Sequence, residues 1–473
     1  MSTPQAGDLG DAVFDPNAQD DVPPDTEGPT PLVAVGELVM GVALSLPRRG
    51  ASPVQHRIAA ANEQARLLAL SRLERFLPGY DFAAAAQNTD DRRFSVLEIG
   101  TELLEHLDAV RVIERLIGEK EHAFAPGGVT FSHGDSKGHQ LPPPMAARGM
   151  NSASNPYGRL EVGGLAANLA TQWTTILNGI DRFDPRIAAV ASDVSAVYGA
   201  RVNTNVYLSF ADATGFGPHW DTHDTIIVQV HGEKRWALYN PTVLSAQAPW
   251  SDRGVSGSEI WRGVLRPGMA LMIPRGWGHE VLGSDDLSIH YTIGINRVEV
   301  HHLLERVAYE AGMQPLLRAD VPFDLRAPIL SYAGTPLEDP NGLGREIGDL
   351  ITPELIDRGV ASYRARLELR RHSQLTATFA PLALDRWDGT VIRIPTVGAV
   401  MMLDESADAV TLGFDNRSVQ IRAEALDAFV ALADSEPRAL DALPPVLVDG
   451  EDQRARFVRE LVANNIAVLE TRT

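Results

Sequence analysis

The chain has 473 residues, no cysteine and a formal net charge of −20. This length allows two or three domains, and the missing cysteine excludes disulfides, cysteine-ligated zinc, iron–sulfur clusters and a cysteine nucleophile. The negative charge disfavours nucleic acid, whose phosphates it repels, and favours basic polypeptides as partners.

The N-terminal quarter of the chain is first acidic and then rich in helix formers. Residues 1–31 hold seven acidic residues, six prolines and no Lys or Arg, which predicts a disordered acidic tail without a secretory signal. Residues 55–77 and 95–117 have apolar residues at helical spacing, so each predicts an amphipathic helix. We therefore expect residues 32–124 to form a helical N-terminal region, to which no role is assigned.

Strand-forming sequence follows from about residue 163 to 297. Short alternating or apolar runs are separated by Gly and Pro turns, among them NTNVYLSF, TIIVQVHGEKRWALY and LSIHYTIGI, a texture that predicts a sandwich or jelly roll. Residues 298–372 are predicted to be mostly helical. Residues 373–473 combine helices with short strands, which indicates a winged-helix-like module. The fold class expected for the whole chain is α+β, with no run apolar enough to cross a membrane.

A His-x-Asp pattern, which can supply two metal ligands, occurs at His106/Asp108, His133/Asp135 and His219/Asp221. The first pair falls in a predicted helix, where side chains two residues apart diverge and cannot share a metal. The second falls in a loop without a strand to hold it. The third precedes a long strand, and because side chains alternate along a strand, His219 and Asp221 project from one face.

A third ligand must then come from a segment distant in sequence. His279 follows the turn PRGWG and precedes a strand, which makes it the candidate. Two histidines and one carboxylate with open positions form the facial triad of non-haem Fe(II) oxygenases, whereas catalytic zinc sites usually carry another ligand set. The sequence therefore predicts a metal centre at His219, Asp221 and His279 with Fe(II) as the metal.

An anion-binding residue is also expected near this centre. Lys234 lies in the segment HGEKRW, so a hairpin would bring it back toward the metal. A buried lysine needs an anion, and a dicarboxylate such as 2-oxoglutarate is one. The alternative is an exposed hairpin lysine, in which case Arg275 is the next candidate.

Two strands carry polar residues at every second position. These are Asn205, Tyr207 and Ser209 on NTNVYLSF, and Ser288, His290 and Thr292 on SIHYTIG. Such rows line either a polar barrel interior or the solvated outer face of a sheet.

Taken together, these segments are similar to the JmjC-type 2-oxoglutarate oxygenases, and among them to the ribosomal-oxygenase branch. The pieces that carry the resemblance are, in chain order, ILNGIDRFDP, VNTNVYLSF, GFGPHWDTHDTIIVQVHGEKRWALY, PGMALMIPRGWGHEV and SIHYTIGI. The resemblance implies a double-stranded β-helix, a cupin-like jelly roll, over residues 125–297. By layout alone, it implies a dimerisation region at 298–372 and the branch's C-terminal module at 373–473.

The resemblance also implies roles for individual residues. Iron would lie on His219, Asp221 and His279, and the distal carboxylate of 2-oxoglutarate on Lys234. Asn205 and Tyr207 would line the co-substrate pocket. There are departures, because residues 1–120 show no match and Gly294 stands where some members carry a hydroxyl residue.

The implied reaction is hydroxylation of a protein or peptide side chain with Fe(II), 2-oxoglutarate and O₂, on a ribosomal protein by family analogy. A peptide-tailoring hydroxylase of natural-product biosynthesis would use the same site, and a lysine demethylase fits the layout less well. A dimeric binding module with an inactive cupin core is the non-enzymatic alternative, against which the complete triad argues. We expect a cytoplasmic homodimer with a basic polypeptide partner and neither nucleic acid nor membrane.

Overall fold

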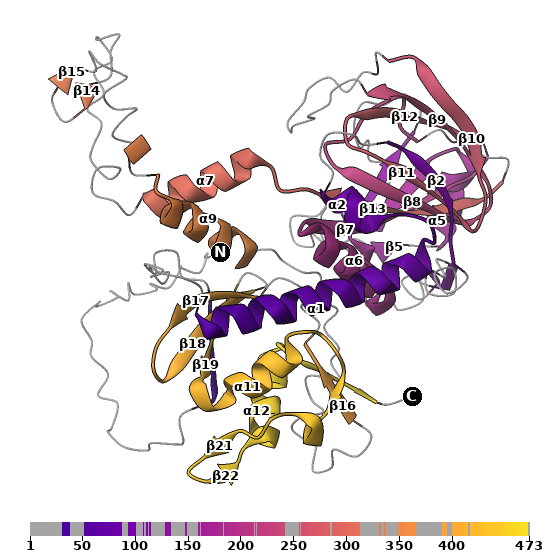
Figure 1. Cartoon of the computed structure of the whole chain (residues 1–473). Coiled ribbons are helices and arrows are strands. Elements are labelled where there is room, and N and C mark those ends of the chain that lie inside the picture. Colours follow the sequence, from indigo (N-terminus) through magenta and orange to yellow (C-terminus); the bar gives the residue numbers. More distant parts are fainter. Residues whose placement is uncertain are drawn as a thin grey trace, which may run out of the picture. The chain divides into compact units, whose positions relative to one another are not determined.

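The strands of the central segment form two antiparallel sheets (Figure 1). The larger sheet has the strand order β2-β11-β8-β13-β7-β6-β3, and the smaller has the order β10-β9-β12. The bounds are β2 Ser95–Glu98, β3 Val129–Ser132, β6 Thr174–Leu177, β7 Arg201–Ser209, β8 Asp224–His231, β9 Lys234–Pro241, β10 Glu259–Leu265, β11 Met269–Ile273, β12 Trp277–Gly283 and β13 Ser288–Asn296.

The computed structural model describes the chain in segments. These are residues 31–37, 52–87, 93–100, 107, 110–111, 113–114, 128–133, 147–148, 159–160, 162–182, 184–211, 213, 215–241, 255, 257–283, 286–312, 331–332, 335–336, 348–349, 351–365, 390–394, 400–414 and 417–471. The predicted tail, apart from Pro31, and the pair His106/Asp108 lie outside the described residues.

A hydrophobic cluster joins the two central sheets. Ile227 of β8 and Leu271 of β11 pack with Trp236 and Leu238 of β9, all of them buried. Burying the apolar faces of two antiparallel sheets against each other is what stabilises a jelly roll. The predicted jelly-roll architecture is therefore confirmed.

Helix α6 packs on the larger sheet, and α1 packs on α6. In α6 (Pro185–Tyr198), Asp184 caps the first turn by accepting from two backbone N–H groups, and Gly199 ends the helix in the left-handed conformation. The predicted helix over 55–77 is confirmed as α1 (Pro53–Phe76). Arg72 of α1 binds the buried carboxylate of Asp193 on α6 through two hydrogen bonds of 2.8 and 2.6 Å.

The predicted helix over residues 95–117 is wrong for its first four residues, which form a strand. Ser95–Glu98 is strand β2, paired antiparallel with Met269–Met272 of β11. The four residues alternate in burial, and pairing with the free edge of a sheet outweighs a weak helical pattern. The N-terminal region thus contributes a strand to the central sheet, besides its short helix α2 (Phe82–Gln87).

The region 298–372 contains helices α7 (Val300–Ala311) and α9 (Pro353–Ala365) among its described residues, together with two short strands. The two helices pack through Val307, Ala311 and Leu355. The remaining described elements before residue 366 are α5 Val162–Ala170, the 3-10 helix Ile180–Arg182, and the strands β4 Ala147–Arg148, β5 Arg159–Leu160, β14 Ser331–Tyr332 and β15 Thr335–Pro336.

The C-terminal residues combine helices with small antiparallel sheets around a separate hydrophobic cluster. Val33–Glu37 (β1) from the N-terminal region completes one of these sheets by pairing with β19. The other bounds are β16 Thr390–Arg393, β17 Met401–Glu405, β18 Ala409–Phe414, β19 Arg417–Arg422, α11 Ala423–Leu432, β20 Arg438–Ala439, a 3-10 helix Leu440–Ala442, β21 Leu447–Val448, β22 Glu451–Asp452, α12 Arg454–Ala463 and β23 Val468–Thr471. No helix among the described residues is long and apolar enough to span a membrane.

Candidate metal centre and its cavity

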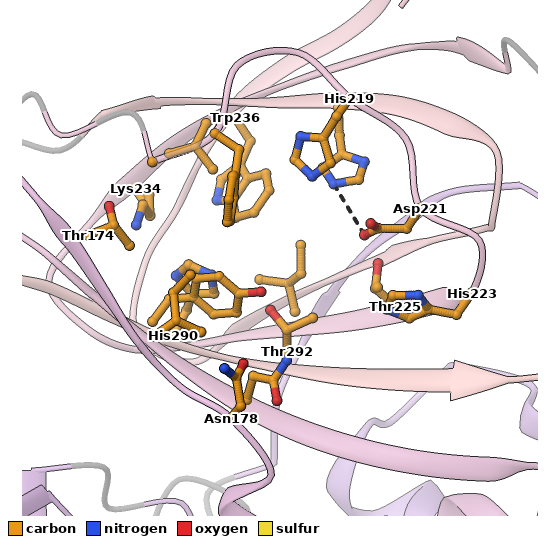
Figure 2. A pocket seen from close by; sticks show the side chains of 18 of the residues that line it. Thr174, Asn178, His219, Asp221, His223, Thr225, Lys234, Trp236, His290 and Thr292 are labelled. Atoms are coloured by element: carbon orange, nitrogen blue, oxygen red, sulfur yellow. Dashed lines mark ion pairs between the residues drawn. The ribbon is translucent and has the colours of Figure 1, made fainter. Parts of the chain in front are cut away.

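A cavity of about 290 Å³ lies between the two central sheets. Alternate residues of β7 and β13 line it, and the two strands are in register, with Tyr207 opposite His290 and Asn205 opposite Thr292. The polar rows seen in the sequence therefore face the interior rather than solvent. Figure 2 shows His290 and Thr292 among the side chains that surround this space.

His219, Asp221 and His279 form a cluster at one end of this cavity (Figure 2). One potential ligand atom from each lies within 4.8 Å of the other two, and His279 Nε2 is 3.6 Å from Asp221 Oδ2. The backbones of His219 and His279 exchange two hydrogen bonds of 3.0 and 2.8 Å. This bridge brings together two segments that are 60 residues apart in the sequence.

The hydrogen bonds of the two rings leave their Nε2 atoms available. His219 Nδ1 lies 2.8 Å from the carbonyl oxygen of Gly217, and His279 Nδ1 lies 3.2 Å from that of Trp277. Because a carbonyl only accepts, each Nδ1 carries a proton, so Nε2 is the ring nitrogen that would bind a metal. Burial, and then the neighbouring His219, lower the pKa of His279 to about 4, so His279 is neutral, as a metal ligand must be.

Lys234 is buried in the same cavity, away from the cluster (Figure 2). Only 2% of it is exposed, so the exposed-hairpin alternative is excluded. Its ammonium group donates to Ser209 Oγ at 2.6 Å, and burial lowers its pKa to about 7. Arg275, the second candidate, is not among the cavity-lining residues, and its guanidinium group is paired with Glu299.

Asn205 and Tyr207 also line the cavity. Asn205 Oδ1 accepts from the backbone N–H of Gly179 at 3.0 Å, which ties its side chain to the start of the 3-10 turn. The Tyr207 ring stacks on His290 at a centroid distance of 4.8 Å. Burial raises the pKa of Tyr207 and, together with Lys234, lowers that of His290, so both are neutral.

A family model described as JmjC domain matches residues 179–303. The chain carries a JmjC domain. The match covers every residue of the candidate centre, and it confirms the resemblance drawn from the sequence. The matched residues include strands of both sheets around the cavity and the three candidate metal ligands.

Curated relatives align with about a quarter to two fifths of this chain. The bifunctional lysine-specific demethylase and histidyl-hydroxylase NO66 of Caenorhabditis briggsae is 31% identical over 138 residues, which is 27% of this chain and 18% of that protein. Ribosomal oxygenase 2 of Rattus norvegicus is 34% identical over 115 residues, or 24% of this chain and 25% of that protein. The chain thus matches about a fifth to a quarter of each relative's length.

Solved structures of an Escherichia coli protein extend the likeness in fold beyond the JmjC domain. The ribosomal oxygenase YcfD, in complex with cobalt and 2-oxoglutarate, superposes with a TM-score of 0.52 at 16% identity. The superposition covers 83% of this chain and 99% of that chain. At this identity the likeness concerns the fold alone.

A second group of possible ligands lies just after the JmjC strands, at Glu299, His301 and His302. Its hydrogen bonds argue against a metal. The backbone N–H of Glu299 donates to His302 Nδ1 at 3.2 Å, so the proton of that ring is on Nε2. The Glu299 carboxylate is already held by Arg275 and by His301. Of the other sequence candidates, His133 is exposed and Asp135 lies outside the described residues.

Within the part of the chain that the structure describes, three cavity residues carry buried polar atoms without a hydrogen-bond partner. They are Thr174 Oγ1, Trp236 Nε1 and His290 Nδ1. Buried polar groups are normally satisfied, so these atoms are available to a polar ligand. The alternation along SIHYTIG pointed to His290, but no pattern in the sequence pointed to Thr174 or Trp236.

Proposed function

We propose that this protein is an Fe(II)- and 2-oxoglutarate-dependent oxygenase that hydroxylates a side chain of a protein or peptide, with a ribosomal protein as the first candidate. The observation that carries the proposal is the placement of the His219–Asp221–His279 cluster and the buried Lys234 in one cavity. Two histidines and a carboxylate suit Fe(II). A buried lysine suits the distal carboxylate of 2-oxoglutarate.

Different residues of the cavity would have different roles. His219, Asp221 and His279 would hold the iron, and Lys234 with Ser209 would fix the far end of the co-substrate. Asn205 and Tyr207 would line the space between them. When bound, iron with O₂ and 2-oxoglutarate supplies the oxidation, which yields succinate, CO₂ and a hydroxylated product. The walls formed by Trp236 and Ile227 would exclude water from the reacting groups.

The lining of the cavity favours hydroxylation of an uncharged side chain over lysine demethylation. Among the described lining residues the only carboxylate is that of Asp221, which the metal would engage. A cationic target would therefore lack a counter-ion, whereas Asn178, Asn203 and Thr292 offer hydrogen bonds to a neutral group.

The decisive test is mass spectrometry of proteins from cells with and without this protein. A mass increase of one oxygen atom on a ribosomal protein, restored by the wild type and not by Asp221→Ala, is the expected result. If ribosomal proteins are unchanged while a short precursor peptide gains oxygen, the peptide-tailoring alternative is correct.

We also propose a homodimer formed through residues 298–372. Val300 and Leu304 lie one turn apart on α7 and are 73% and 55% exposed, and Ile356 on α9 is 44% exposed. Such an apolar face on a helical pair fits a second copy. We expect a dimer mass by light scattering at micromolar concentration, and a monomer for Val300→Glu combined with Leu304→Glu. A monomeric wild type would contradict this prediction, and Arg57→Glu, on the exposed face of α1, is the matched control.

The C-terminal residues 373–473 are proposed to be a winged-helix-like module that binds polypeptide in a cytoplasmic protein. They contain sixteen acidic and nine basic residues, a balance that opposes phosphate binding. We expect no salt-sensitive binding of duplex DNA by the full chain in a fluorescence anisotropy titration. Binding that weakens steeply with salt and is lost on deleting residues 373–473 would contradict the prediction.

A further inference from the structure

Gly294 leaves a gap in the row of side chains that β13 points into the cavity. His290 and Thr292 precede it at alternate positions and both line the cavity, and Gly294 lies opposite Asn203 of β7 and Thr225 of β8. Its φ is outside the positive range that favours glycine. Glycine is therefore needed here for room and not for backbone conformation.

The ring of His223 fills that gap. A Cβ atom added to Gly294 would lie 2.8 Å from His223 Cδ2 and 3.0 Å from His223 Nε2. It would also lie 3.3 Å from Asn203 Oδ1. Any larger residue at position 294 must displace the His223 ring, which is the movable end of a side chain.

His223 belongs to the metal end of the cavity. It follows Asp221 by two residues and lines the cavity with Asp221 and Thr225. Figure 2 shows His223 beside Asp221 and on the opposite side of the cavity from Lys234. The co-substrate anchor is thus at the far end, and His223 faces the part of the cavity left for the substrate.

We propose that His223, seated against Gly294, is a positioning residue that hydrogen-bonds an uncharged polar group of the polypeptide substrate beside the metal. The inference rests on the proposed function. Among the described residues no hydrogen bond is recorded to either nitrogen of its ring, so the ring is available to a ligand. A backbone carbonyl or a side-chain amide is the class of group that one imidazole can orient without a counter-ion.

A double-mutant cycle separates this role from a merely structural one. His223→Ala removes the ring, whereas Gly294→Ala keeps it and displaces it. Each variant, and the double variant, is assayed with 2-oxoglutarate and acid-extracted ribosomal proteins. Succinate and oxygen-containing product are both measured, and 2-oxoglutarate affinity is determined by calorimetry on the Mn(II)-loaded protein. His231→Ala, an exposed histidine at the end of β8, the strand that begins directly after His223, is the matched control.

We expect each single variant to form roughly tenfold less product per succinate, because the substrate is misplaced relative to the metal. The double variant should be no worse than either single variant, since both changes remove one interaction. The 2-oxoglutarate Kd should stay within about twofold of the wild type in His223→Ala, because co-substrate binding uses other residues.

Two results would overturn the inference while leaving the proposed function intact. One is a His223→Ala variant that forms as much product per succinate as the wild type. The other is a Gly294→Ala variant with strongly weakened 2-oxoglutarate binding that His223→Ala does not relieve, since Gly294 would then make room for the co-substrate. Absence of succinate formation by the wild type would instead overturn the proposed function itself.

Discussion

Replacing His219 by alanine is expected to abolish turnover and to weaken Fe(II) or Mn(II) binding by well over the ~10–100-fold that loss of an outer-shell partner costs. The variant leaves Asp221 and His279, and two ligands do not make the facial set that holds Fe(II). The measurement is bound metal per chain after dialysis, with succinate formation assayed in parallel.

The control for this prediction is His133→Ala, in the competing His-x-Asp pair. Its side chain is exposed, so metal content and turnover should equal those of the wild type. Metal binding that survives in His219→Ala and disappears in His133→Ala would contradict this prediction, because the metal would then be bound by the pair that contains His133. A third comparison, His301→Ala, tests the group around Glu299 and is expected to leave the metal content unchanged.

Replacing Lys234 by alanine is expected to weaken 2-oxoglutarate binding by about 2 to 5 kcal/mol, the cost of removing one partner of a buried ion pair. The metal should still bind, because Lys234 contacts none of the three ligands and its recorded hydrogen bond is to Ser209. Lys234→Arg keeps the charge and should lose much less affinity. Calorimetry on Mn(II)-loaded protein measures both, and an unchanged Kd in Lys234→Ala would remove Lys234 from the co-substrate site.

The pH dependence of 2-oxoglutarate affinity follows from the same lysine. Burial lowers the pKa of Lys234 from 10.5 to about 7, so in the free protein the group is charged below about pH 7 and neutral above it. A bound carboxylate favours the charged form and raises this pKa again. Binding above pH 7 therefore takes up a proton.

The affinity should accordingly fall as the pH rises above about 7, by up to about tenfold per pH unit. Proton uptake should appear as a dependence of the binding enthalpy on the ionisation enthalpy of the buffer. Lys234→Arg stays protonated throughout, so its affinity should be independent of pH over this range. A wild-type affinity that does not change with pH would mean that Lys234 stays charged in the free protein.

Most of what could be predicted about the site from the sequence came from the alternation of side chains along an extended chain. Alternation along an extended chain predicted His219 and Asp221 on one face, although in the structure both precede β8. Strand parity put Tyr207 with Asn205 and His290 with Thr292. The structure has these residues in one cavity. Parity is a local property of an extended chain, with a period of two residues, and for this reason it can be read without knowledge of the fold.

Only the tertiary structure decided how the strands meet. The pairing of Ser95–Glu98 with β11 overrode a helical pattern, because an edge strand gains its hydrogen bonds from a partner far away in the sequence. The partnership of His223 and Gly294 joins residues 71 positions apart. The burial of Lys234, on β9, depends on Ser209 and on the larger sheet that faces it. Such contacts depend on register and layer packing, which a local period does not specify.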